Sequence, residues 1–444
     1  MPAIGPNYRK LVTASTISNL GDGVGFIAYP WLASVVTRNP LLIALIGVAQ
    51  RLPWLLLTLP AGVVADRVDR HRIMVAANTV RAVLTLLVAF AILGSGSDLP
   101  GPNQLELVLE TDRLLYFLVL VATLLLGTAE VFHDNAAQSF LPTIVAEEHL
   151  AKANGRLYAA ENVSNQFLGP PLGSLLLAAG FALPFFVDAG TFAVAAVLVT
   201  LIRVPARARP VVADGQQRPT WRADLREGVA WLWRHRFLRH LAITLGVMNL
   251  LTTMASATFV LFCQEVLGTN TREYAVLTII AAVGAVVGGW VAGAVVGRLG
   301  VGPTLRTVMT AFVVIAVLFA SNSSWVVAAL LLVVEYFAIV VWNVITVSLR
   351  QTLIPDRLLG RVNSVYRFFG WGMIPVGALL GGLIVAFADG PVSRETALRL
   401  PHYASAGLMA LLLVGFALTR LTTAAAEAAK AETSAVPTPE PTEA

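Results

Sequence analysis

GVVADRVDRHR, residues 62–72, is a short basic loop between two long apolar runs. A related loop, GAVVGRLGVGPTLR at residues 293–306, again follows a long apolar run. Arg67 of the first loop corresponds to Arg298 of the second at a shift of 231 residues. Self-similarity at a fixed spacing indicates an internal duplication. We therefore expect the chain to consist of two related halves.

A second pair of loops repeats in the same order. LPTIVAEEHLAKANG, residues 141–155, leads into one apolar run, and LIPDRLLGRVNS, residues 353–364, leads into another. Asn154 corresponds to Asn363 at a shift of 209 residues. Because both pairs lie in corresponding loops of the two halves, similar composition alone does not explain them.

The composition is typical of a membrane protein. Of the 444 residues, 57% are hydrophobic and 13% are charged, whereas soluble domains carry about 25% charged residues. A spanning helix needs about 20 mainly apolar residues. Twelve segments qualify: 11–36, 41–65, 73–94, 114–139, 154–180, 182–203, 241–264, 275–297, 306–321, 325–349, 363–388 and 402–420. We predict an all-α integral membrane protein with twelve transmembrane helices in two pseudo-symmetric six-helix bundles.

The distribution of basic residues predicts the orientation. Of the 31 Lys and Arg residues, 23 fall in the termini and even-numbered loops, five in odd-numbered loops and three within helices. The positive-inside rule then predicts that both termini are cytoplasmic. Because the net charge of +5 follows this topology, it does not indicate nucleic-acid binding. Cys263 is the only cysteine, so a disulfide framework is excluded.

The loop between the halves predicts the domain boundaries. We expect an N-terminal bundle at 1–203, a linker at 204–240, a C-terminal bundle at 241–420 and a disordered cytoplasmic tail at 421–444. The linker segment WRADLREGVAWLWRHRFLRH alternates aromatic and basic residues. That pattern is typical of an amphipathic helix on the inner membrane surface.

The loop at 62–72 resembles motif A of the major facilitator superfamily, Gly-x-x-x-Asp-Arg-x-Gly-x-Arg-Arg. Asp69 replaces the second glycine and His71 replaces one basic residue. The matching residues are Gly62, Asp66, Arg67, Arg70 and Arg72. The resemblance implies two bundles that rock about a midplane cavity. It also implies a latch in which Asp66 sits near Asn363 and Ser364, at the N-terminal end of helix 11.

Other segments resemble one branch of this superfamily, that of the enterobactin exporters and macrolide efflux pumps, also called transmembrane secretion effectors. These segments are SNLGDGVGF, AQRLPWLLLTLPAGVVADR, LREGVAWLWRHRFLR and IPDRLLGRVNSVYRFFGWGMIPVGALLGG. In helix 5, LGPPLGS partly matches motif C of the antiporters, and we expect a bend at Gly169, Pro170 and Gly173. Helix 4 lacks the arginine of motif B, so the resemblance does not define the coupling route.

Charged residues within the apolar segments are candidate functional groups, because charges in the bilayer are costly unless they are paired or hydrated. Asp22 and Arg51 lie at similar depth, about 16 Å into their helices at 1.5 Å per residue, and so can meet. Their pair is either a structural clamp or a protonation switch. Glu130 and Glu335 are either proton carriers or anions that recognise cationic substrates.

Further residues are assigned on weaker grounds. Six aromatic residues either line a cavity or pack in the core: Phe26, Tyr29, Trp54, Trp342, Phe368 and Trp371. Four buried charges are expected to be structural hydrogen-bonding groups: Arg81, Glu161, Asp188 and Arg367.

The function expected from the resemblance is transport, not enzyme catalysis, with no metal or cofactor. The chain has no Gly-x-x-x-x-Gly-Lys-Ser/Thr loop, which excludes ATP-driven transport by this chain alone. We expect multidrug-type efflux of a drug or lipophilic natural product such as a macrolide, by proton antiport with alternating access. The expected partners are an amphipathic small molecule, protons and membrane lipids, and the expected form is a monomer in the bacterial inner membrane.

Two alternatives remain open at this point. One is a siderophore exporter of the same fold, with Arg51, Arg81 and Arg367 as partners of an anionic substrate. The other is a non-transporting membrane sensor or scaffold that uses the Arg-rich linker and the tail.

Overall fold

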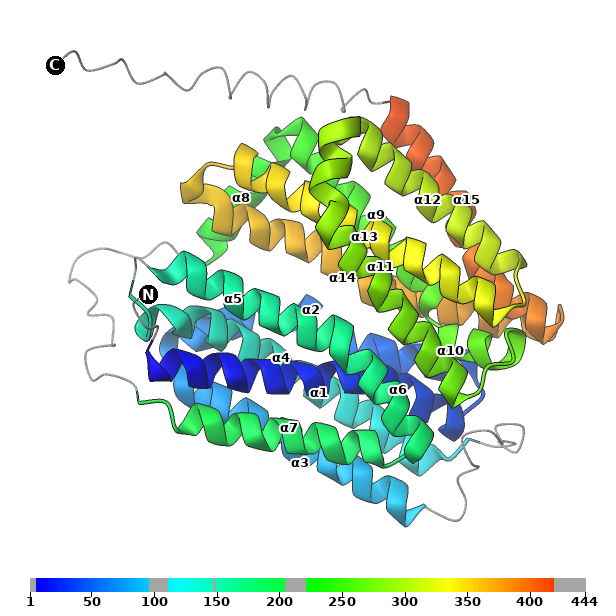
Figure 1. The fold of residues 1–444 in the computed structure, drawn as a ribbon, viewed down its shortest axis with the longest axis horizontal. Helices are drawn as coiled ribbons and strands as arrows, with labels where there is room; N and C mark the ends of the chain where they lie inside the picture. The colour runs from blue at the N-terminus through cyan, green and yellow to red at the C-terminus, as the bar shows by residue number, and fades with distance from the viewer. Residues whose placement is uncertain (1–4, 96–110, 147–148, 204–220, 419–444) are drawn as a thin grey trace.

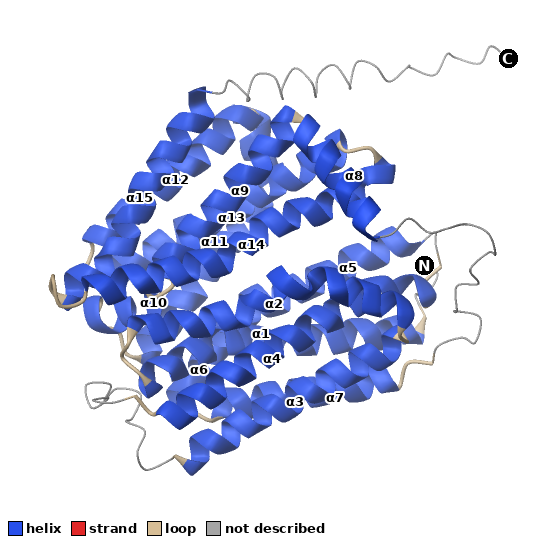
Figure 2. Cartoon of the chain, turned by 180° about the vertical axis from the view of Figure 1, so that it is seen from behind, coloured by secondary structure: helices blue, strands red, loops and turns tan. Residues whose placement is uncertain are grey.

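The computed structural model describes residues 5–95, 111–146, 149–203 and 221–418, and within these ranges every regular element is a helix (Figures 1 and 2). The helices are α1 (Pro6–Val36), α2 (Pro40–Arg67), α3 (Arg70–Gly94), α4 (Arg113–Phe140), α5 (Leu150–Asn162), α6 (Gly169–Ala179), α7 (Leu183–Thr200), α8 (Trp221–Arg234), α9 (Arg236–Ser256), α10 (Phe259–Leu261), α11 (Thr271–Leu299), α12 (Val301–Ser321), α13 (Trp325–Leu353), α14 (Asp356–Ala388) and α15 (Arg394–Leu418). A 3-10 turn lies at Leu141–Thr143, and π-helical turns lie at Val163–Leu168 and Phe262–Val266.

Ten helices in the described ranges are long and apolar enough to cross a membrane. The two other predicted segments are also helical: α1 has 31 residues, and the fifth segment forms α5, a π-helical turn and α6 in succession. The seventh segment is not one continuous helix, because α9 ends at Ser256 and a π-helical turn follows α10. The predicted all-helical membrane fold is confirmed.

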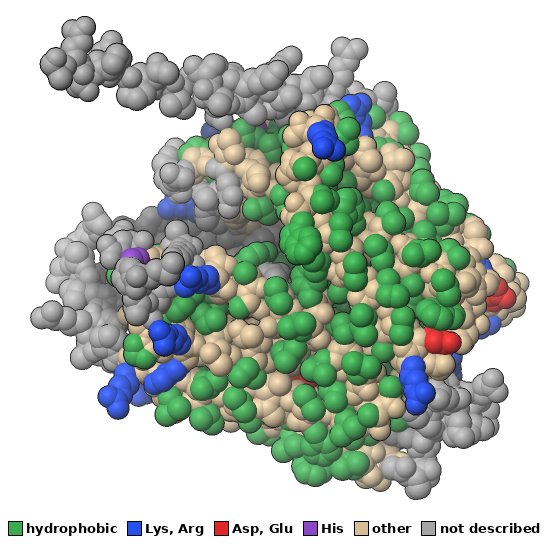
Figure 3. Space-filling view, in the orientation of Figure 1, with side chains coloured by type: hydrophobic (Ala, Val, Ile, Leu, Met, Phe, Trp, Pro, Cys, Tyr) green, Lys and Arg blue, Asp and Glu red, His purple; other side chains and the backbone are tan. Residues whose placement is uncertain are grey.

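The two ends of the helix bundle differ in charge. One end, called the basic end here, carries Arg9, Lys10, Arg67, Arg72, Arg203 and Arg234. The opposite end, called the mixed-charge end, carries Arg38, Asp112, Glu265, Asp389 and Arg394. Hydrophobic side chains cover most of the visible face between these ends (Figure 3), as expected for a surface that faces lipid.

The repeated segments pack in equivalent ways in the N-terminal half (α1 to α7) and the C-terminal half (α8 to α15). Gly173 of α6 lies against α1, so that a Cβ atom there would come within 2.7 Å of the Val24 carbonyl oxygen. Gly377 of α14 lies in the same way against the backbone of Leu250 in α9. Small residues allow such close helix contacts in membranes.

The two halves touch from the middle of the bundle to the mixed-charge end. Trp54 of α2 packs edge-on against Trp371 of α14, with ring centroids 5.1 Å apart. The hydroxyl groups of Ser174 in α6 and Thr278 in α11 form a 3.2 Å hydrogen bond. Toward the basic end the ribbons of the two halves diverge (Figures 1 and 2). The halves therefore form a V that is closed at the mixed-charge end.

An ion-pair network, called the Glu265 network here, joins the halves at the closed end. Arg38, between α1 and α2, pairs with Glu265. Arg394 of α15 binds the same carboxylate at 2.9 Å and donates from Nη2 to the Arg38 carbonyl oxygen at 2.8 Å. Gln264 donates from Nε2 to the Ser34 hydroxyl of α1 at 2.9 Å. Burial lowers the pKa of Arg38, and Glu265 opposes that effect, so the Arg38 guanidinium remains charged at neutral pH.

Helix α8 of the predicted linker packs against α14. Glu227 of α8 forms an ion pair with Arg361 of α14, and a Cβ atom at Gly228 would lie 2.8 Å from the Arg361 carbonyl oxygen. The preceding linker residues 204–220 and the predicted tail at 421–444 lie outside the described residues.

We predict that Gly284→Val destabilises the fold. A Cβ atom at this position of α11 would collide with the Val333 carbonyl oxygen of α13, and overpacking of this kind costs about 1–3 kcal/mol or more. The thermal midpoint of the purified protein should fall. Gly297→Val on the same helix is the control, because nothing lies within 4 Å of a Cβ atom there. Equal midpoints for the two variants would contradict the proposed packing.

Candidate functional site

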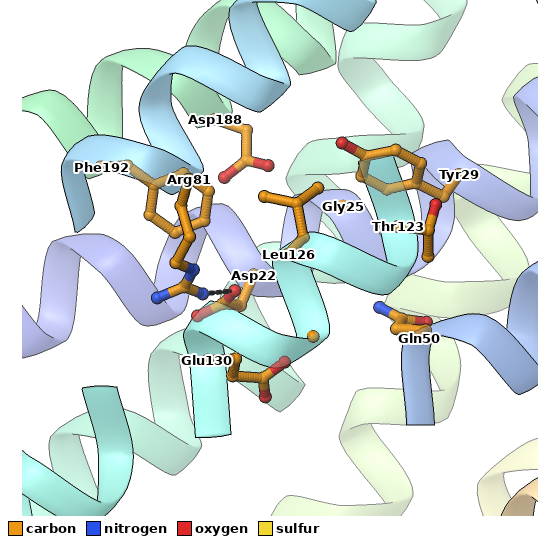
Figure 4. Close-up of a pocket in the computed structure, with 11 residues that line it drawn as sticks. Asp22, Gly25, Tyr29, Gln50, Arg81, Thr123, Leu126, Glu130, Asp188 and Phe192 are labelled. Carbon is orange, nitrogen blue, oxygen red and sulfur yellow. Dashed lines mark hydrogen bonds and ion pairs between the residues drawn. The ribbon is translucent and has the colours of Figure 1, made fainter. Parts of the chain in front are cut away.

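A small cavity lies inside the N-terminal half, enclosed by α1, α2, α3, α4 and α7 (Figure 4). Its volume is about 30 Å³, roughly the space that one water molecule occupies. Polar and charged side chains dominate one part of its wall. The lining residues are Asp22, Gly25, Tyr29, Gln50, Arg81, Thr123, Leu126, Gly127, Glu130, Asp188 and Phe192.

Asp22 of α1 pairs with Arg81 of α3 (Figure 4). The sequence indicated Arg51 as its partner, but no ion pair joins Asp22 to Arg51 in the described part of the chain. The Arg81 side chain is only 2% exposed, and its guanidinium carbon lies 4.0 Å from the ring centroid of Phe192 in α7. An opposite charge and an aromatic face thus both stabilise this buried cation.

Glycines on α1 allow α7 to approach the site. A Cβ atom at Gly25 would lie 3.4 Å from Oδ2 of Asp188, and one at Gly21 would collide with Asp188 and Thr191. The absence of side chains at these two positions brings the carboxyl group of Asp188 next to α1. Asp188 is 3% exposed. The hydroxyl of Thr191 donates to the Asp188 backbone carbonyl at 2.7 Å and lies 3.5 Å from the carboxyl Oδ1.

The cavity contains more acidic than basic groups. Asp22, Glu130 and Asp188 all line it, whereas Arg81 is the one basic side chain among its lining residues. The sequence predicted functional roles for Asp22 and Glu130. It assigned Asp188 a structural role, and Arg81 either a structural role or, in the siderophore alternative, that of an anion partner. The spacing of Asn78, Arg81 and Thr85 already places three polar residues on one face of α3.

The other two predicted charged residues lie elsewhere. The guanidinium carbon of Arg51 in α2 is 6.0 Å from the ring centroid of Phe26. Glu335 is half-buried in α13 of the C-terminal half, and within the described ranges it forms no hydrogen bond or ion pair. The structure therefore brings Asp22 and Glu130 to one cavity and keeps Glu335 apart from them. The side chain of Arg367 lies outside the described residues.

The six predicted aromatic residues fall into two groups. Phe26, Phe368 and Trp371 are 43%, 48% and 41% exposed, and Trp371 contacts Trp54 across the two halves. Tyr29 is buried and packs edge-on against Phe185, with ring centroids 5.0 Å apart. Trp342 is 2% exposed. Trp342 therefore belongs to the core and Tyr29 borders the small cavity, so neither lines a larger substrate pathway here.

The loop that resembles motif A is tied to its own half. Arg70 donates to the carbonyl oxygens of Ala65 at 3.1 Å and Ser139 at 2.6 Å. His71 bonds to the Val199 carbonyl oxygen at 2.8 Å. Gly62 lies in α2, and Arg67 and Arg72 are exposed. These contacts connect the ends of α2, α3, α4 and α7.

The expected latch, in which Asp66 sits near Asn363 and Ser364 of α14 (the eleventh predicted segment), remains a prediction. The side chains of Asp66 and Ser364 lie outside the described part of the structure. Asn363 accepts a 3.1 Å hydrogen bond from Arg350.

The bend predicted in the fifth segment, residues 154–180, coincides with a change of helix type. The π-helical turn at Val163–Leu168 ends where Gly169 and Pro170 begin α6. A Cβ atom at Gly169 would come within 2.5 Å of the Cα atom of Gly23 in α1. Glycine at both positions is therefore required for this contact between α1 and α6.

Comparison with known proteins agrees with this architecture. The multidrug efflux pump Tap of Mycobacterium bovis (strain BCG / Pasteur 1173P2) is 26% identical over 255 residues, which are 56% of this chain and 55% of the pump. The match thus spans about half the length of that relative. The enterobactin exporter EntS of Salmonella choleraesuis (strain SC-B67) is 27% identical over 393 residues, 85% of this chain and 86% of the exporter.

Solved structures share the fold at lower identity. A bacterial homologue of the iron transporter ferroportin in its inward-facing state has a TM-score of 0.69 and 15% identity, with 94% of this chain and 98% of that chain covered. Its outward-facing state has a TM-score of 0.56 and 16% identity, with 93% of this chain and 100% of that chain covered. The family model of the Major Facilitator Superfamily matches residues 11–377. This chain is therefore a multi-pass membrane protein that belongs to the major facilitator superfamily.

Proposed function

We propose that this transporter exports a drug or a lipophilic natural product, such as a macrolide, in exchange for protons. The observation that carries the proposal is the buried cavity in which three carboxyl groups, those of Asp22, Glu130 and Asp188, meet the one guanidinium of Arg81. The excess of acids over bases provides groups that can take up protons within the span of the membrane.

Electrostatics explains why an acidic side chain in this cavity suits proton coupling. Removing a charge from water costs several kcal/mol unless an opposite charge compensates. Arg81 compensates Asp22, which leaves Glu130 without an ion-pair partner among the described residues. Protonation would remove the uncompensated charge of Glu130. Binding and release of protons would therefore change the forces between α1, α3 and α4, the helices that carry these three residues.

The substrate class is inferred from the half-exposed aromatic residues. Phe26, Phe368 and Trp371 offer apolar and aromatic surface between α1, α2 and α14, as the walls of drug-sized ligand sites commonly do. The printed function of one relative, a multidrug efflux pump, supports a substrate of this kind.

We also propose that the basic end faces the cytoplasm of a bacterial cell, with both termini on that side of the inner membrane. The positive-inside rule supports this orientation. The V would then open toward the cytoplasm, which is an inward-facing conformation. The higher TM-score against the inward-facing solved structure, 0.69 compared with 0.56, supports the same assignment. In this scheme the Glu265 network closes the extracellular side and must open to release substrate.

Siderophore export is the second candidate, because the enterobactin exporter matches 85% of this chain. An anionic substrate would need a free cationic partner. Arg81 is already paired with Asp22, so Arg51, beside the half-exposed Phe26, is the described residue best placed for that role. A sensor or scaffold role finds no support, because the family is one of secondary transporters.

The proton-coupling test uses energised inside-out vesicles. We expect a macrolide or a cationic dye to dissipate the proton gradient in vesicles with the wild-type protein, and Asp22→Asn and Glu130→Gln to abolish this response. Glu395→Gln is the control, because Glu395 lies on α15 in the other half and pairs with Arg399 of its own helix. The measurement is the fluorescence of a pH-sensitive dye, at equal amounts of folded protein.

A response to a catecholate siderophore alone, lost in Arg51→Gln, would support the second candidate instead. Gradient dissipation that is unchanged in both acidic variants would contradict the assigned coupling site.

If the Glu265 network is the gate on the extracellular side, Glu265→Gln should favour opening of the mixed-charge end. The label site is Ser34→Cys in a Cys263→Ala background, because Ser34 is buried and contacts Gln264 of the other half. Loss of the network should raise the labelling rate by a membrane-impermeant maleimide about fivefold, equivalent to about 1 kcal/mol for a partly exposed ion pair. Glu395→Gln is the control, because it removes an ion pair at the same end but within one helix. Equal rates in both variants would refute the gate.

A further inference from the structure

We infer that Asp188 is a second proton-carrying group of the cavity, and that Arg81 exchanges between Asp22 and Asp188 during transport. In the present conformation Arg81 pairs with Asp22, and the inference assigns the neutral, protonated form to Asp188. The inference rests on the proposed proton coupling and extends it: the site becomes a relay between two carboxyl groups that share one arginine.

The first step is the position of Asp188. It lies on α7, 3% exposed, and lines the same cavity as Asp22 and Arg81. Figure 4 shows the Asp188 carboxyl group pointing toward the interior of the site, on the side of Arg81 away from Glu130. Arg81 therefore lies between acidic groups contributed by different helices.

The second step concerns the partners of Asp188. The groups near it on the packed helices are Asp22 and Tyr29 of α1 and Arg81 of α3, whereas Glu130 of α4 lines the cavity on the far side of Arg81. In the described part of the chain, the nearest hydrogen-bonding group to its carboxyl is the Thr191 hydroxyl at 3.5 Å, and that hydroxyl donates at 2.7 Å to the Asp188 backbone carbonyl. Asp188 thus lacks the cationic partner that Asp22 has.

The third step is a set of buried polar atoms close to Arg81. Nε of Arg81 and both side-chain polar atoms of Asn78 are buried and have no hydrogen-bond partner in the described ranges. Buried polar groups are normally satisfied. The guanidinium therefore has an unused donor, and Asn78 on the same helix has an unused amide group, which suits a side chain with more than one bonding arrangement.

Burial makes the ionised form of Asp188 costly. Ionised Asp188 would be an unpaired charge enclosed by protein within the membrane span, and such charges are strongly disfavoured unless they are paired. Protonated Asp188 carries no charge and can donate its O–H. A single cation can compensate one carboxylate at a time, so Asp22 and Asp188 alternate between the ionised and the neutral form.

The exchange balances in protons and charge. Asp22 takes up one proton and becomes neutral, which releases Arg81. Asp188 gives one proton to water in the cavity, and its carboxylate becomes the new partner of Arg81. The net charge of the three residues is the same before and after the exchange. One proton enters at α1 and one leaves at α7 for each exchange.

Infrared spectroscopy of the purified full chain in lipid nanodiscs, with each variant compared to the wild type, tests this inference without substrate. We expect the wild type to show C=O stretching intensity from protonated carboxyl groups at neutral pH, and Asp188→Asn to lose the part of that band that Asp188 contributes. Asp22→Asn should weaken the same band, because Arg81 loses its partner and pairs with Asp188. Glu395→Gln, which removes an exposed carboxyl group in the other half, should leave the band unchanged.

Each outcome decides one part of the inference. A full band in Asp188→Asn would show that Asp188 is not the protonated group. A band of Asp188 that keeps its full intensity in Asp22→Asn would rule out the exchange of Arg81. If Asp188→Asn does not fold, Asp188→Glu keeps a carboxyl group and should shift the band in frequency without loss of intensity. Because no substrate is present, absence of drug-driven proton flux would overturn the proposed function alone.

Discussion

The ion pair between Asp22 and Arg81 is the contact on which the arrangement of the N-terminal half depends. Each charge alone would cost several kcal/mol in surroundings that exclude water, and removal of one partner would leave the other uncompensated. The pair therefore holds α1 and α3 at one relative depth. Phe192 extends this constraint to α7, because its ring lies 4.0 Å from the Arg81 guanidinium carbon. A change in the protonation of Asp22 would act on all three helices together.

Close helix packing makes this arrangement possible. On one side of α1, Gly21 and Gly25 leave room for Asp188 and Thr191 of α7. On another side, Gly23 meets Gly169 of α6 backbone to backbone. The consecutive odd-numbered glycines thus serve two different neighbours, since residues two apart lie about 200° apart around a helix. Space on both sides of α1 is needed for a buried charge to meet its partner, and bulky residues would separate the helices that carry the charges.

Sequence alone predicted the fold better than the site. The lengths of the apolar segments and the duplicated loops around Arg67 and Arg298 are features of the linear sequence, so they can be identified without a structure. Position along a helix was also readable, and Asp22 lies near the middle of α1. The direction in which a side chain points was not, because it depends on how helices rotate and pack. Arg51 and Arg81 lie at similar depths, and packing selected Arg81. The place of Asp188 in the cavity was missed for the same reason, because its neighbours there come from other helices.

Helix α1 links the buried cavity to the closed end of the V. It is one continuous helix from Pro6 to Val36, with Asp22 at its middle and Ser34 beside Gln264 of the other half. The twelve residues between Asp22 and Ser34 span about 18 Å at 1.5 Å per residue. Pro30 lies inside this stretch and removes one backbone hydrogen bond, so the helix connects the two sites through a point where it can bend. The Glu265 network holds that end through exposed ion pairs of modest strength, whereas the buried pair is stronger and sensitive to protonation. The stronger contact is therefore suited to set the position of the helix, and the weaker contact is suited to open in response.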